Sequence, residues 1–103
     1  MKRRLKPSEI RLAKLLVGSS GLVARERIRE AFWGADPEGG PDNMENIISI
    51  MVCNLRGALR ELGVDRAVMT DRGAGYVVAA DKRRDMMHAL LRLEEARLEH
   101  PTQ

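Results

Sequence analysis

Apolar residues recur at helical spacing in four stretches of the chain, and extended or glycine-rich segments separate these stretches. The spacing predicts a first helix over residues 8–17, which a Gly-Ser-Ser-Gly run ends. Leu22 and Val23 predict a brief extended segment, and residues 25–33 predict a second helix. The first third of the chain is therefore expected to fold as helix, short strand and helix.

The longest helical pattern covers residues 43–62 and follows an acidic loop, residues 34–42, rich in glycine and proline. Gly63 is typical of a helix end. One apolar stripe is predicted to face the core: Ile48, Val52, Leu55, Leu59 and Leu62. Further apolar residues fall outside this stripe: Ile47, Ile50, Met51 and Cys53. This extra surface is expected to meet a second subunit, a protein partner or thymine methyl groups in a DNA groove.

The last part of the chain predicts a β-hairpin and one more helix. Residues 67–70 and 76–79 are strand-like, and the turn at 71–75 gives the hairpin a basic tip. From 81 to 99 the helical pattern returns. Its apolar residues fit either a helix packed on the domain's own core or a short dimer seam, and the main stripe consists of Met86, Leu90 and Leu93.

Composition limits the fold class and the cellular compartment. A chain of 103 residues is typical of one domain, and 3% aromatic residues imply a core of aliphatic side chains. Cys53 is the single cysteine, so an internal disulfide is excluded, and a reduced, buried thiol in a cytoplasmic protein is expected. The basic amino terminus lacks the apolar segment of a signal peptide, and no stretch reaches the roughly 20 apolar residues of a membrane span.

The net charge is only +3, but the charge is unevenly distributed. Residues 1–33 hold nine Lys or Arg against three Asp or Glu, whereas residues 34–65 hold two against six. A basic first third suits contact with phosphates. No nucleotide-binding glycine motif, metal-ligand spacing or nucleophile motif appears, so we expect neither an enzyme nor a cofactor or metal site.

Five short segments in a fixed order resemble the OmpR/PhoB-type winged-helix DNA-binding domain, over about residues 5–78. The segments are 5–12, 21–26, 32–34, 55–59 and 70–76, the last carrying Thr-x-Arg-Gly-x-Gly-Tyr. The resemblance implies a mainly α winged helix-turn-helix fold with a three-helix core, a small β-hairpin as the wing and an extra C-terminal helix. We expect the DNA-binding domain at residues 1–80 and a packing or dimerisation helix at 81–103.

The resemblance also implies a DNA-binding transcription regulator. It implies that the helix at 43–62 lies in the major groove and that the wing at 67–79 lies against the minor groove or phosphates. Arg56 and Thr70 match phosphate contacts, and Arg72 matches the wing-tip arginine. We further expect Asn54 to contact an adenine edge and Ile50 a thymine methyl group. The full predicted DNA-binding set is Asn46, Ser49, Ile50, Asn54, Arg56, Thr70, Arg72 and Gly73.

Groove-facing positions that are usually charged or polar in that family are here Asn46, Ile47, Ser49, Met51, Cys53 and Asn54. Fewer cations predict weaker DNA binding with a smaller salt dependence. An alternative hypothesis follows, in which the winged helix is a protein-interaction module that binds RNA polymerase or another regulator. The candidate partner-binding residues are Ile47, Met51, Met86, Leu90 and Leu93.

Three further expectations concern the surroundings of the domain. Because only seven residues precede the first helix, we expect a stand-alone domain without a receiver domain or an amino-terminal sheet. The loop at 34–42 matches a loop that contacts RNA polymerase in some members of the family. We expect a homodimer on double-stranded DNA, associated with the nucleoid in the cytoplasm, with a basic arm formed by Lys2, Arg3 and Arg4.

Overall fold

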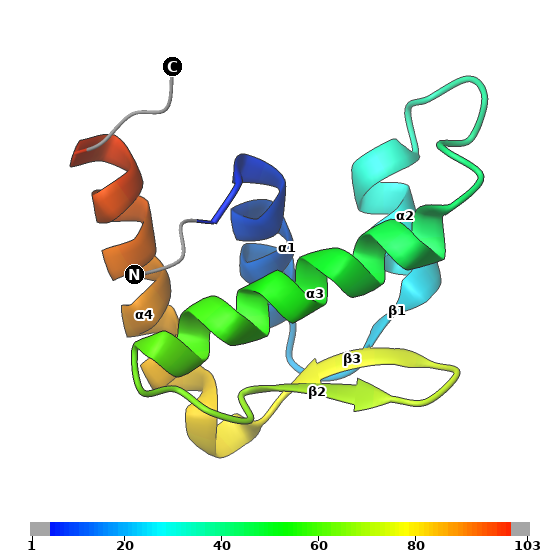
Figure 1. Cartoon of the computed structure of the whole chain (residues 1–103). Helices are drawn as coiled ribbons and strands as arrows, with labels where there is room; N and C mark the ends of the chain where they lie inside the picture. Colours follow the sequence, from blue (N-terminus) through cyan, green and yellow to red (C-terminus); the bar gives the residue numbers. More distant parts are fainter. Residues whose placement is uncertain (1–4, 100–103) are drawn as a thin grey trace.

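The structure is a computed structural model that describes residues 5–99, with side chains placed up to residue 96. Within this range, four α-helices pack together with a three-stranded antiparallel sheet, which lies along one side of the molecule (Figure 1). The elements are α1 (Pro7–Val17), β1 (Val23–Ala24), α2 (Arg25–Trp33), α3 (Met44–Glu61), β2 (Val68–Asp71), β3 (Gly75–Val78), the 3₁₀ turn η1 (Ala80–Lys82) and α4 (Arg83–Glu99). The mainly α winged helix-turn-helix architecture is confirmed.

The predicted helix boundaries agree with the structure because local chemistry defines them. Pro7 occupies the first turn of α1, where its missing N–H is not needed. At the C-terminal end of α3, Gly63 has a φ of 82° and ends the helix. The Val64 N–H there donates to the Leu59 carbonyl at 2.9 Å. This is the backbone pattern that a C-terminal glycine favours, and it turns the chain toward the hairpin.

The starts of α3 and α4 differ from the predicted starts at residues 43 and 81. Asn43 precedes α3, but its side chain makes no capping hydrogen bond. Asp81 lies within η1, so α4 begins at Arg83. The Arg83 guanidinium donates to the carbonyl oxygens of Val17 and Ser19, the latter at 2.7 Å, beside the C-terminal end of α1. A cation stabilises a helix at that end, so this contact joins the start of α4 to α1.

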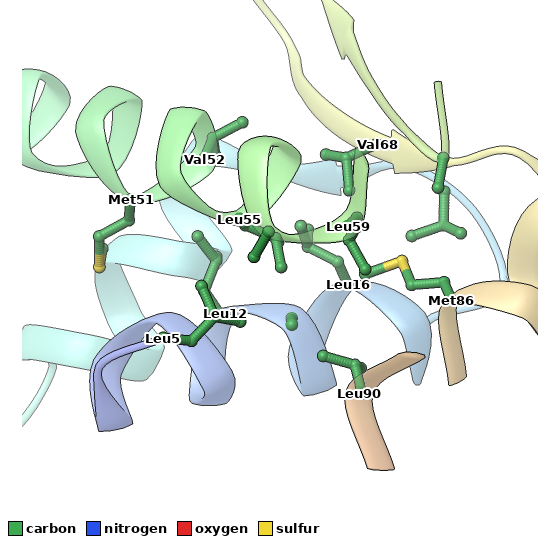
Figure 2. Packing of buried hydrophobic residues seen from close by; sticks show 14 of the residues in the cluster. Leu5, Leu12, Leu16, Met51, Val52, Leu55, Leu59, Val68, Met86 and Leu90 are labelled. Carbon is green, nitrogen blue, oxygen red and sulfur yellow. The ribbon is translucent and has the colours of Figure 1, made fainter. Parts of the chain in front are cut away.

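The core is a single aliphatic cluster in which α3 packs against α1. Figure 2 shows Leu55 and Leu59 of α3 facing the side of α1 that carries Leu12 and Leu16, with Met86 of α4 at one end of the cluster. Both leucines of α3 are at most 1% exposed. Each fully buried leucine contributes about 1.5–3 kcal/mol to folding, so this cluster determines how α3 is oriented.

Several residues predicted to bind a partner belong to this core instead. Met51 is 6% exposed, because it lies three residues after Ile48 and four before Leu55, on the same side of α3. The stripe on α4 is also buried, which supports the packing interpretation over the dimer seam. The prediction of partner binding is therefore wrong for Met51, Met86, Leu90 and Leu93, while Ile47 is half-buried against the core.

The sheet has the strand order β1-β3-β2. The hairpin of β2 and β3 forms the wing, and Figure 1 shows it running alongside α3. Gly75 pairs with Ala24 on one side and Asp71 on the other. An added Cβ at Gly75 would lie 2.1 Å from the Val23 carbonyl oxygen, so the close approach of β1 requires glycine there.

No helix among residues 5–99 combines the length and the apolar character that crossing a membrane requires.

We predict that Gly75→Ala lowers the free energy of unfolding by about 1–3 kcal/mol, because the new methyl group forces β1 and β3 apart. Urea denaturation followed by circular dichroism measures this change. Gly21→Ala is the matched control, since an added Cβ at Gly21 meets no atom within 4 Å. Equal stability of the two variants would contradict the packing of β1 against β3.

Candidate nucleic-acid interface

The outward face of α3 carries a mixture of uncharged polar side chains and apolar side chains. Asn46, Ser49, Ile50 and Cys53 are exposed, and Ile50 has 52% of its surface accessible. The expected burial of Cys53 is therefore wrong. Residues 46–55 include no charged residue. This face can therefore offer hydrogen bonds and apolar contact, but its centre offers no cation to a phosphate.

Arg56 joins this helix to the wing. Its Nε donates to the Val68 carbonyl oxygen at 3.0 Å, and its Nη2 donates to Thr70 Oγ1 at 2.6 Å. The side chain is half-buried, whereas Thr70 is exposed on β2. The structure thus brings together two residues that the sequence predicted as phosphate contacts, 14 positions apart in the chain.

The tip of the wing presents Arg72 to solvent. Gly73 follows it with a φ of 80°, a conformation that glycine adopts without steric cost. A hydrogen bond also fixes the tip, because the Arg25 N–H donates to the Ala74 carbonyl oxygen at 3.2 Å. Arg72 is therefore held on a turn that is joined to the start of α2.

Asn54 is turned away from the outward face of α3. Its Nδ2 donates to Glu9 Oε2 of α1 at 2.7 Å, and Glu9 Oε1 accepts the Lys6 N–H at 2.8 Å. Glu9 is only 3% exposed, so the Asn54 amide supplies a hydrogen bond that the buried carboxyl group needs. The contact of Asn54 with an adenine edge stays a prediction, and it would compete with the hydrogen bond to Glu9.

The sequence did not distinguish Arg25 from the other arginines of α2. In the structure Arg25 lies half-buried between α2 and α3, with its Nη1 3.4 Å from Glu45 Oε1 and its Nε buried without a hydrogen-bond partner. A hollow of about 450 Å³ opens beside it. Both signs of charge line this hollow, including Arg29 and Asp42, so it is not a uniform anion site.

Other charged residues near α3 and the amino terminus add less to the interface. Arg60, the second arginine of α3, lies 3.6 Å from Asp65 Oδ1 in an exposed ion pair. Lys2, Arg3 and Arg4 lie outside the described residues. No group of three or more His, Cys, Asp or Glu side chains within the described range is arranged to hold a metal ion.

We predict that Asn54→Ala destabilises the fold by about 1–3 kcal/mol, because it leaves a buried oxygen of Glu9 without its donor. Thermal and urea unfolding measure the loss. Asn46→Ala, which truncates an exposed amide on the same helix, should leave stability unchanged. If the two variants have the same free energy of unfolding, the contact between Asn54 and Glu9 does not stabilise the fold.

Comparison with known proteins agrees with this geometry. No curated protein and no solved structure matched the chain. A family model described as "Transcriptional regulatory protein, C terminal" matches residues 2–78, which include α1, α2, α3 and the whole wing. The match covers more than half of the chain and ends at the last residue of β3, before α4. The chain therefore belongs to the family of OmpR/PhoB-type C-terminal DNA-binding domains of transcriptional regulatory proteins.

Proposed function

We propose that this protein regulates transcription by placing α3 in the major groove of double-stranded DNA and the wing against the adjacent minor groove or phosphates. The observation that carries the proposal is the bonding of Arg56 to Val68 and Thr70. This contact joins the helix and the wing in one surface. The proposal places the protein on the nucleoid.

The dimensions of α3 suit the major groove. Its 18 residues span roughly 27 Å at 1.5 Å per residue, and the groove, at about 12 Å wide, admits an α-helix. The core occupies the opposite side of the helix, so Asn46, Ser49 and Ile50 are the side chains directed at base edges. Thr70, Gly73 and the guanidinium of Arg72 face the DNA backbone from the wing.

Arg56 and Arg72 have different roles in this proposal. Arg56 is held by two acceptors of β2, so its charge lies between α3 and the wing, where a phosphate of the groove edge would pass. Arg72 is exposed on the turn and can enter the narrow minor groove, whose negative potential attracts arginine. Together they provide the register of the protein on the duplex, while α3 provides base contacts.

A protein-interaction role of the same outward face is the second candidate. The absence of charge from residues 46–55 and the exposure of Ile50 favour it. The burial of Met51 reduces the apolar surface available, so the candidate contact is limited to Ile50, Cys53 and part of Ile47. DNA affinity that does not change with salt would favour this role over phosphate contact.

We also propose that the loop at 34–42 contacts RNA polymerase. Asp36, Glu38 and Asp42 are exposed, and the Glu38 N–H donates to Asp36 Oδ1 at 2.9 Å, which gives the loop a local turn. The loop connects α2 and α3 at the end of the molecule away from α4 (Figure 1). An acidic, exposed surface there can meet a basic protein surface without repelling DNA from the wing.

A homodimer would use the outer face of α4. Met87 and Leu91 are 50% and 58% exposed, one turn apart. Arg84 and Glu95 are also exposed near the two ends of this face, so an antiparallel pair of helices would bring Arg84 of one copy to Glu95 of the other. These four residues replace the buried stripe of α4 as the proposed dimer contact.

Arg72→Ala should lower affinity for duplex DNA severalfold and reduce the slope of log affinity against log salt by about 1, because one phosphate or groove contact is lost. Arg56→Ala should also weaken binding. Electrophoretic shift assays at several salt concentrations measure both effects, with Arg92→Ala on α4 as the control. Unchanged binding by both test variants would contradict the placement of the wing on DNA.

Leu91→Lys should convert the dimer to a monomer in sedimentation equilibrium, because a charge replaces apolar surface at the centre of the contact. Leu22→Lys, which changes another exposed leucine (45% against 58% for Leu91) beside β1, should leave the mass unchanged. A monomeric wild-type protein at micromolar concentration, or a dimer in the Leu91→Lys variant, would exclude this use of α4.

A further inference from the structure

The base-contacting face of α3 differs from a guanine-recognising helix. Guanine is most often recognised by an arginine or lysine that donates to its O6 and N7 atoms. In α3, Arg56 already donates to Val68 and Thr70, and Arg60 is paired with Asp65. Residues 46–55 contain no arginine or lysine at all. The centre of the helix therefore lacks the donors that select guanine.

The side chains that this face exposes match the A·T base pair instead. Adenine offers an acceptor and a donor, N7 and N6, which the amide of an asparagine or glutamine fits, and thymine offers a C5-methyl group that apolar side chains contact. Asn46 is exposed, and within the described residues its amide has no hydrogen-bond partner. Ile50 is 52% exposed on the same side of the helix.

The spacing of these two side chains fits neighbouring base pairs. Residues four apart in a helix are separated by about 6 Å along the axis, and stacked bases by about 3.4 Å. Asn46 and Ile50 can therefore contact base pairs one or two steps apart. Cys53, exposed on the next turn, extends the apolar contact as a small side chain.

We infer that α3 selects A·T base pairs in the major groove, with Asn46 contacting adenine and Ile50 contacting a thymine methyl group. The inference rests on the proposed function and specifies the class of DNA site. Asn54, the other asparagine of α3, is not given this role because its amide is turned toward α1 and donates to Glu9. Asn46 and Ile50 are thus specificity-determining residues, whereas Arg56 and Arg72 contribute affinity.

The test begins with selection of bound duplexes from a random pool by the full chain. We expect the selected sites to share A·T pairs where α3 contacts them. Replacing thymine by uracil at each position of the best site then removes only the methyl group. At one position this should weaken wild-type binding about fourfold, the value expected for losing one buried methyl contact.

Variants assign this effect to individual residues. In Ile50→Ala the uracil duplex and the thymine duplex should bind equally, because the methyl group no longer has a partner. Asn46→Ala should lose preference for adenine at one position, by roughly 5- to 150-fold. Arg92→Ala, on the exposed side of α4, is the control and should keep the wild-type base preference.

The outcomes separate this inference from the proposed function. Selected sites with G·C pairs under α3, or a uracil effect that persists unchanged in Ile50→Ala, would overturn the A·T assignment while leaving DNA binding intact. No enrichment of any duplex and no binding to genomic fragments would overturn both. Circular dichroism of the variants checks that they are folded, as expected for substitutions at exposed positions.

Discussion

Leu55 and Leu59 are removed from water where α3 crosses α1, and Val68 and Met86 complete the same cluster from β2 and α4. The orientation of α3 depends on this contact. With one side of the helix committed to the core, Asn46, Ser49 and Ile50 are directed outward, and Arg56 is directed to the wing. Loss of the leucines would therefore affect function as well as stability, because a rotated α3 would present different side chains.

The connection between α3 and the wing is the second constraint. Besides the pairing of β1 with β3, hydrogen bonds from other elements hold the hairpin: the bonds from Arg56 to Val68 and Thr70, and the bond from the Arg25 N–H to the Ala74 carbonyl. Gly75 allows β1 to approach closely enough for the last of these. A surface arranged before binding loses less conformational entropy when it binds DNA. This smaller entropy cost offsets the weaker attraction to phosphates that follows from the small number of cations on α3.

Local signals explain why the sequence predicted the elements well. Pro7, Gly63 and the glycines of the loop at 34–42 mark element ends that depend only on neighbouring residues. The resemblance then matched Arg56 and Thr70 each to a phosphate contact, and the structure adds the hydrogen bond between them. The sequence could not indicate that Asn54 contacts Glu9, because 45 positions separate them and only the crossing of α1 and α3 brings them together.

Other errors have the same origin. Met51 fits the helical spacing of the core stripe, yet its burial depends on which elements pack against that side of α3. Met86, Leu90 and Leu93 fit a core stripe or a dimer seam equally well, and only the position of α4 beside α1 decides between them. The contact of Arg83 with the end of α1 fixes that position.

The central claim is that the outward face of α3 and the wing form one DNA-binding surface. Titration of the ¹⁵N-labelled protein with a selected duplex, followed by amide chemical shifts, tests it most directly. Shift changes should be concentrated at Asn46, Ser49, Ile50, Thr70 and Arg72, with the exposed side of α4 unaffected. Changes confined to α4, or a wing that does not respond while α3 does, would contradict it.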